Sequence, residues 1–166
     1  VGFSFTGAIR SDGMFFTWGF GSFGQLGFGS VIFYFSPVQI GSSSWTFVSA
    51  GVIHTAAIRS DGKLFTWGYG GRGNLGDGAA VSRSSPVQIG SSSWTSVSAG
   101  RYYTASVRSD GRFFIWGYNT SGQLGDGTTG LKSSPVQVGG IFWQTSQSSP
   151  VQIGSSSWTS VSAGGT

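Results

Sequence analysis

Cysteine and glutamate are absent from the 166-residue sequence, and charged residues make up only 8% of it. Without cysteine the chain can form neither a disulfide framework nor a thiolate metal site. No apolar run approaches the roughly 18 residues that a membrane-spanning helix needs, so we expect no membrane span. One histidine and five acidic residues are too few to suggest a catalytic set, so we predict no enzymatic activity, no cofactor and no metal site.

Glycine and aromatic residues are abundant instead. The sequence holds 30 glycines and 7 tryptophans, and aromatic residues make up 16% of it. Disordered chains usually have high charge and few aromatics, so this composition favours a folded, turn-rich β-protein. The formal net charge of +4 gives a slight preference for acidic partners. Because Val1 opens directly within a repeat and no signal peptide is found, we expect a mature or partial product.

One segment occurs three times in the chain. The stretch SSPVQIGSSSWTSVSAG at 84–100 recurs unchanged at 148–164, and with two differences at 35–51. The first two copies start at positions 35 and 84, and a fixed period of this size is typical of repeat architectures such as propellers. We therefore interpret 1–166 as a single repeat domain. The same period, 49, relates three core motifs, at 5–41, 54–90 and 103–139.

Tryptophans also follow this period. Because a buried tryptophan removes a large apolar area from water, we predict that the regularly spaced indoles form the structural core. Two positions of the period hold tryptophan. The first is occupied by Trp18, Trp67 and Trp116, and the second by Trp45 and Trp94.

Within one period the letters predict four short strands and no helix. TSVSAG at 95–100 and HTAAIRS at 54–60 carry small and β-branched residues, and KLFTWGYG at 63–70 and SSPVQIG at 84–90 complete the set. The dipeptide Asp61-Gly62 predicts a type I′ hairpin turn. Four antiparallel strands per repeat make one blade, so the fold class is all-β, a β-propeller.

A long motif carries a resemblance to a known family. IRSDG, WG and GQLGDG follow one another in 9–29, 58–78 and 107–127, with variations, and VSAGxxHT stands at 48–55. This pattern resembles the regulator of chromosome condensation repeat, which implies a seven-bladed propeller. With one blade to each period, the chain holds about three blades of that ring. The ring could be completed by further blades of a longer chain or by other chains, or the repeats could stack openly.

The period slips after Pro135. The next equivalent proline is Pro150, a spacing of 15 in place of 49, which leaves a deficit of 34 against a full period. We expect a gap near 145–148, with 148–166 a partial repeat. The first repeat is unusual as well, because Phe33, Tyr34 and Phe35 replace polar residues of the next repeat. They could form a hydrophobic docking patch or reflect uncertain residue assignment, so we assign them no function.

Candidate chemical residues have structural interpretations. His54 occupies a strand position that holds Phe5 and Tyr103 in the other repeats, which favours packing over catalysis. Arginine and aspartate two positions apart, as in Arg59 and Asp61, favour a local pair at a turn. Asp77 and its equivalent Asp126, the acids of the GDG loops, supply too few oxygens for a calcium site.

The remaining basic residues include equivalent positions. Lys63 matches Arg112 and Arg83 matches Lys132 in neighbouring repeats, so each pair is expected on one face of a ring. Such a face could attract DNA or an acidic polysaccharide with salt-dependent affinity, but solvation of a charge-poor surface is the favoured interpretation of these charges.

The sequence favours a noncatalytic scaffold that binds other proteins, as a surface, virion or filament component. An extracellular, cell-surface or virion-surface location is favoured over the cytoplasm. The resemblance also implies an alternative, a guanine-nucleotide exchange factor for a small GTPase that binds chromatin. A third hypothesis is a plant-type ultraviolet-B photoreceptor, which the resemblance links to a GWRHT-like motif. Here GVIHT at 51–55 and GRYYT at 100–104 lack that tryptophan. GDP release or ultraviolet-dependent dissociation would separate the two alternatives from the scaffold.

Overall fold

The computed structural model describes residues 2–139, and this part of the chain is entirely β and loop. None of the described residues forms a helix that could span a membrane. The predicted gap near 145–148 and the partial repeat 148–166 lie outside the described residues. The described residues form eleven strands: β1 Phe5–Ile9, β2 Phe15–Gly19, β3 Tyr34–Gln39, β4 Trp45–Ala50, β5 His54–Arg59, β6 Leu64–Gly68, β7 Arg83–Gln88, β8 Trp94–Ala99, β9 Tyr103–Arg108, β10 Phe113–Gly117 and β11 Lys132–Val138.

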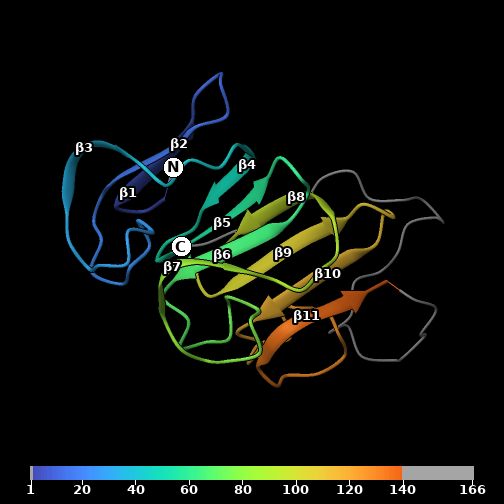
Figure 1. The fold of residues 1–166 in the computed structure, drawn as a ribbon. Helices are drawn as coiled ribbons and strands as arrows, with labels where there is room; N and C mark the ends of the chain where they lie inside the picture. The colour runs from blue at the N-terminus through green and yellow to red at the C-terminus, as the bar shows by residue number, and fades with distance from the viewer. Residues whose placement is uncertain (1, 140–166) are drawn as a thin grey trace.

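Each sequence period forms one antiparallel sheet. The second sheet runs β4-β5-β6-β7 and the third β8-β9-β10-β11, so both have the four strands predicted for a blade. The first sheet has three described strands, in the order β1-β2-β3. The sheets follow one another side by side, as in a fan (Figure 1). The all-β propeller architecture predicted from the sequence is confirmed.

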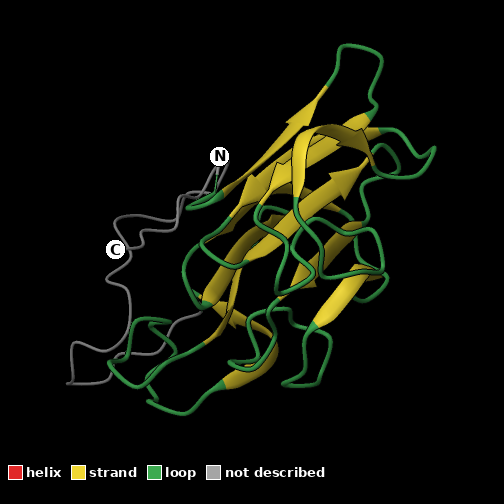
Figure 2. Ribbon diagram, turned by 90° about the vertical axis from the view of Figure 1, so that its left-hand side faces the viewer, coloured by secondary structure: helices red, strands yellow, loops and turns green. Residues whose placement is uncertain are grey.

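The first strand of each complete sheet lies innermost. β4 contacts β8, while β1 packs against β4 and β5 against β8, so neighbouring sheets meet along their inner strands. Figure 2, coloured by secondary structure, shows the described part of the chain as strands and loops. The outermost strands are β3, β7 and β11, and each contains one proline of the repeated SPVQ motif. A proline has no N–H to donate to a ladder, and an edge strand can accommodate it.

The hairpin turns differ from the type I′ turn predicted at Asp61-Gly62. A type I′ turn needs positive φ at both central residues, but among the described residues only glycines have positive φ. Gly62 has a φ of 80°, and its N–H donates to the carbonyl of Arg59. The turn is therefore a longer connection with glycine in its left-handed position. The aspartate stays at negative φ, where its carboxylate accepts the N–H of Lys63 at 3.1 Å.

Four of the five predicted core tryptophans are buried. Trp67 and Trp116 are fully enclosed, and Trp45 and Trp94 are 5% and 6% exposed. Trp45 lies in a cluster with Phe15 and Trp67, and their rings meet edge to face. Trp18 is only half-buried, because no loop of an earlier repeat covers it within the described residues.

A glycine within the first long loop permits close packing on the next blade. Gly27 has a φ of 88°, and a Cβ added there would lie 2.8 Å from Nε1 of Trp67 and 3.1 Å from Ile40. Gly41 has a φ of 54° but open space around it. The two positions therefore share the backbone requirement and differ in steric crowding.

We expect Gly27→Ala to destabilise the protein by about 2–4 kcal/mol, because it adds a steric clash to the cost of positive φ. The matched variant Gly41→Ala carries only the backbone cost, about 1 kcal/mol. Urea unfolding followed by tryptophan fluorescence measures both. Equal losses in the two variants would show that close packing on Trp67 is unimportant.

Candidate interaction surface

A main-chain carbonyl in each of the first two long loops joins one blade to the next. The carbonyl of Gln25 accepts the Thr55 hydroxyl at 2.8 Å and the indole N–H of Trp67 at 2.9 Å. One period later, the carbonyl of Asn74 accepts Thr104 and Trp116 at 2.8 and 3.0 Å. All these donors are buried, so each joint satisfies polar groups that would otherwise be costly.

The single histidine belongs to the second joint. His54 is completely buried, and its Nε2 lies 2.8 Å from the hydroxyl of Thr104. That hydroxyl already donates to the carbonyl of Asn74, so it accepts from His54, whose Nε2 carries the proton. Burial lowers the pKa of His54 to about 4, because the charged imidazolium would lose its hydration. The site keeps a neutral histidine at ordinary pH.

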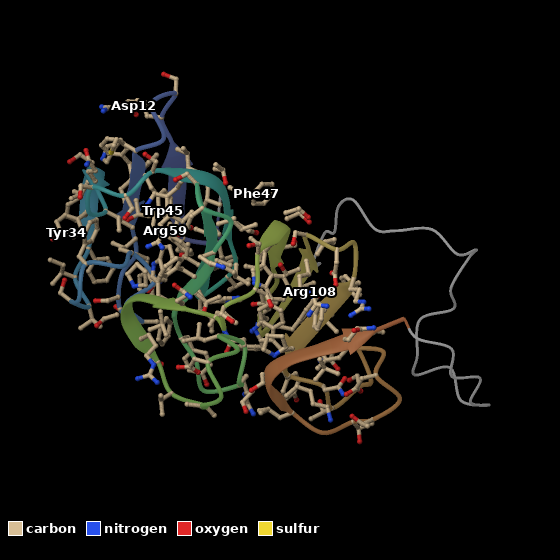
Figure 3. All side chains as sticks on the ribbon, turned by 45° about the vertical axis from the view of Figure 1, so that its right-hand side comes forward. Asp12, Tyr34, Trp45, Phe47, Arg59 and Arg108 are labelled. Carbon is tan, nitrogen blue, oxygen red and sulfur yellow. The ribbon has the colours of Figure 1, made fainter. Side chains whose placement is uncertain are left out.

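Arginine and aspartate form the predicted local pairs at the β-hairpin turns. Arg59 binds Asp61 at 2.6 Å, and the same pair forms in the first and third sheets. The hydrogen bond from Arg59 lowers the pKa of Asp61 to about 2. The guanidinium also stacks 4.8 Å from the ring of Phe65. Figure 3 labels one member of each pair: Asp12, Arg59 and Arg108.

The strands divide the connections between two ends of the sheets. One end, the turn face, carries the short connections at 10–14, 40–44, 60–63, 89–93 and 109–112. The opposite end, the loop face, carries the long loops and the turns that precede β5 and β9. It comprises 20–33, 51–53, 69–82, 100–102 and 118–131.

The predicted basic residues are split between these faces. Lys63 and Arg112 lie at the turn face, where Lys63 donates to the carbonyl of Ser91 and Arg112 lies 3.6 Å from Asp110. The other two start outer strands at the loop face and neutralise buried carboxylates: Arg83 binds Asp77 at 2.8 Å and Lys132 binds Asp126 at 3.2 Å. That these four basic residues form a surface that binds an acidic partner stays a prediction.

All nine basic and five acidic residues lie within the described range, and each aspartate binds at least one arginine or lysine. The excess of four basic residues gives the net charge of +4. Two basic residues on the loop face were not selected by the sequence analysis: Arg72 and Arg101.

The loop face also carries a continuous series of aromatic rings, which we call the aromatic chain. Successive ring centroids lie 5.1 to 6.2 Å apart, and the series crosses all three sheets. Phe23 and Phe33 are exposed and the other members half-buried. Its members, in order of contact, are Phe33, Phe20, Phe23, Tyr69, Tyr102 and Tyr118.

Both loop-face arginines lie over this aromatic chain. The guanidinium of Arg72 stacks 5.1 Å from Tyr118 and 6.0 Å from Tyr102. Arg101 stacks 5.1 Å from the same Tyr102. Arg72 comes from the long loop of the second sheet and the other residues from the third, so the group bridges two blades. Stacking holds the cations in place, and a guanidinium stacked by its face can still donate N–H groups from its edge to an anion.

The sequence analysis missed Arg72 and Arg101 because the equivalent positions of the other repeats hold different residue types. Arg72 replaces a phenylalanine and a serine in the other repeats, and Arg101 replaces a phenylalanine and a valine. A search for equivalent charges passes over such positions. The useful signal is the reverse: large side chains at loop positions where otherwise similar repeats disagree.

Shallow clefts between neighbouring blades are a second feature. One of about 450 Å³ is lined by Trp45, Arg59 and Phe65, and another of about 360 Å³ by the equivalents Trp94, Arg108 and Phe114. Because their lining repeats with the framework, these clefts follow from blade packing. Within residues 2–139 no three histidine, cysteine, aspartate or glutamate side chains gather to hold a metal ion.

The fold defines a repeat protein built of propeller blades. The sequence profile described as the regulator of chromosome condensation (RCC1) repeat matches residues 12–58, 61–107 and 110–166, and a second profile of that description matches 45–74 and 94–123. The chain belongs to this repeat family, which confirms the resemblance found in the motifs. No curated protein sequence matches the chain significantly.

Solved structures of the same fold are distant in sequence. The chain is similar to Prp20p from Saccharomyces cerevisiae, with a TM-score of 0.76 and 19% identity over 85% of this chain and 37% of that one. It is also similar to human WBSCR16, with a TM-score of 0.74 and 22% identity over 83% of this chain and 36% of that one. The chain thus spans little more than a third of either protein, and these likenesses establish the fold alone.

The buried histidine predicts a pH-dependent stability. The unfolded chain binds a proton on His54 below about pH 6.5, whereas the folded protein resists protonation down to about pH 4. Stability is therefore fully retained above pH 6.5 and falls by about 3 kcal/mol as the pH drops through this window. His54→Phe, which copies Phe5 of the first repeat, should flatten the dependence. Urea unfolding from pH 7.5 to 4.5 provides the measurement, and an equal slope in the variant would contradict the assignment.

The first repeat supplies a natural replacement for an ion pair. At the positions of Asp77 and Arg83 it has Phe28 and Tyr34, whose rings meet at 4.9 Å. We expect Arg83→Tyr alone to cost about 2 kcal/mol, since Asp77 is 4% exposed and would lose its cation. Adding Asp77→Phe should recover most of that loss. A double-mutant cycle in urea would contradict this if the two costs simply added.

Proposed function

We propose that the chain is part of a noncatalytic propeller that binds a protein partner through its loop face. The observation that carries the proposal is the aromatic chain, in which six rings from three blades form one continuous surface. Tyrosine, phenylalanine and arginine are enriched in the cores of protein interfaces, whereas lysine and the acids are depleted. The aromatic chain and the two arginines stacked on it have this composition, and the ring contacts hold these side chains in place before a partner arrives.

A noncatalytic role is supported by how the proton-exchanging groups are used. The five aspartates bind arginine or lysine, and His54 is enclosed between blades. Such groups serve the framework. The cell-surface or virion location expected from the sequence stays a prediction.

The exchange-factor alternative has less support. The yeast relative Prp20p is described by its binding properties to Gsp1p and histones, but the shared fold at 19% identity does not transfer that activity. Insertion into a GTPase needs a specialised loop. Here the loops 20–33, 69–82 and 118–131 have equal length, which fits a uniform framework with distinctive side chains.

Photo-crosslinking tests the loop face as the interface. A benzophenone amino acid at Phe23, on the loop face, should capture a partner protein that the same group at Arg112, on the turn face, does not. With that partner purified, Tyr102→Ala should weaken its binding at least tenfold, because it removes the ring that contacts Tyr69 and Tyr118 and carries both stacked arginines. Calorimetry provides the dissociation constants.

The control is Phe35→Ala. Phe35 is 98% exposed on β3 at the outer margin of the first sheet and is outside the aromatic chain. Its removal should leave the affinity unchanged. The proposal fails if Phe35→Ala abolishes binding and Tyr102→Ala does not, since the interface would then lie on the outer margin.

A further inference from the structure

We infer that Tyr69 and Tyr102 form an oxidative crosslinking site, at which a one-electron oxidant joins the two side chains as dityrosine. Tyr69 directly follows β6 in the second sheet, and Tyr102 directly precedes β9 in the third. The new bond would therefore link two neighbouring blades covalently at the loop face. This inference goes beyond the proposed protein-binding function and does not depend on it.

The two phenol rings are already in contact in the folded protein. Their centroids lie 6.0 Å apart, with an angle of 59° between the ring planes. Both side chains are half-buried, so packing limits their movement while an oxidant in solution can still reach them. Because the reacting groups are held together by the fold, coupling within one molecule should be faster than coupling between molecules.

The residue content of the chain directs oxidation to its aromatic side chains. Cysteine and methionine are readily oxidised in proteins, but the sequence has no cysteine and a single methionine, Met14. Trp67 and Trp116 are fully buried, which keeps a dissolved oxidant away from them. The half-buried tyrosines of the aromatic chain are therefore accessible targets.

The step is a coupling of two phenoxyl radicals. Each phenol gives one electron to the oxidant and releases its hydroxyl proton, so two equivalents of a one-electron oxidant are reduced. Suitable oxidants are the ferryl haem of a peroxidase and photogenerated ruthenium(III). The radicals join through a carbon–carbon bond between the ring carbons next to the hydroxyl groups. The hydrogen on each joined carbon then moves to the neighbouring oxygen, which restores both phenols and leaves a product with two hydrogen atoms fewer.

A second tyrosine pair competes for Tyr102. Tyr118 lies 6.2 Å from Tyr102 at an angle of 70°, so this pair is slightly farther apart and more nearly perpendicular. The guanidinium of Arg72 also stacks 5.1 Å from Tyr118 and would have to move if that ring rotated to form a bond. The geometry therefore favours Tyr69 as the partner of Tyr102.

Photo-oxidation with tris(bipyridyl)ruthenium(II) and persulfate can test the site on the dilute, folded protein. We expect a crosslinked monomer that has lost two hydrogen atoms and shows the fluorescence of dityrosine. Trypsin separates the three tyrosines of the aromatic chain, because basic residues bound the peptides 64–72, 102–108 and 113–132. Mass spectrometry should find 64–72 linked to 102–108.

Phenylalanine variants test the assignment without removing a ring from the aromatic chain. Tyr69→Phe and Tyr102→Phe should each lower the yield of crosslinked monomer at least tenfold. The matched control is Tyr34→Phe, because the ring of Tyr34 contacts Phe28 and lies outside the aromatic chain. This control should change the yield less than twofold.

The fold dependence and the effect on stability complete the test. Oxidation of the wild-type protein in urea should give at least fivefold less of the product that links 64–72 to 102–108, since the ring contact depends on the fold. The isolated crosslinked monomer should unfold about 5–10 °C above the untreated protein, because the bond closes a long loop of the unfolded chain. An unchanged unfolding temperature would contradict a covalent link that holds the two blades together.

Other results would overturn the site itself. A main product that links 102–108 to 113–132 would assign the coupling to Tyr118 in place of Tyr69. A yield that Tyr69→Phe leaves unchanged, or covalent dimers without crosslinked monomer, would show that the contact between Tyr69 and Tyr102 does not direct the reaction.

Discussion

Two donors of one blade converge on a single main-chain carbonyl of the blade before it, and the rest of the structure depends on this joint. The threonine hydroxyl and the indole N–H come from different strands, so the carbonyl fixes both strands relative to the preceding loop. Such bonds contribute about 1 kcal/mol each, and losing one partner in a buried site costs more. Leu26 and Leu75, next to the two carbonyls, are buried as well, so apolar packing closes around each joint. A sheet in this family is therefore completed by its neighbour.

The sequence period predicted the sheets because each repeat carries its own strand, turn and loop signals. The turn type at Asp61 could not be predicted from the Asp-Gly dipeptide alone, because the aspartate also pairs with Arg59 and the N–H of Lys63, which lie outside the dipeptide. Trp18 shares the letters of Trp67 but not its surroundings, and burial depends on what packs against a residue. Local pattern determines the strands, and neighbouring blades determine the environment of each side chain.

The same reasoning explains which site residues could be found. Charges at equivalent positions drew attention to Arg83 and Lys132, yet recurrence marks them as framework partners of buried aspartates. Residues that differ between repeats do not belong to this repeated framework, so they can give one blade a surface that the next blade lacks. Phe28 and Tyr34 are an example, because in the first repeat they form an aromatic pair at the positions where the other repeats have an ion pair. Periodicity thus locates the framework, and departures from it locate the candidate interface.

The prolines of the outer strands have a consequence for a protein whose blades are so alike. Nearly identical strands in adjacent sheets could, in principle, pair with one another between molecules, because an exposed β-edge offers unpaired N–H and C=O groups. Pro37, Pro86 and Pro135 interrupt that row of donors on every described outer rim. Because proline protects the outer edge strand of each sheet, one short sequence can be repeated along a chain without its copies pairing edge to edge into fibrils.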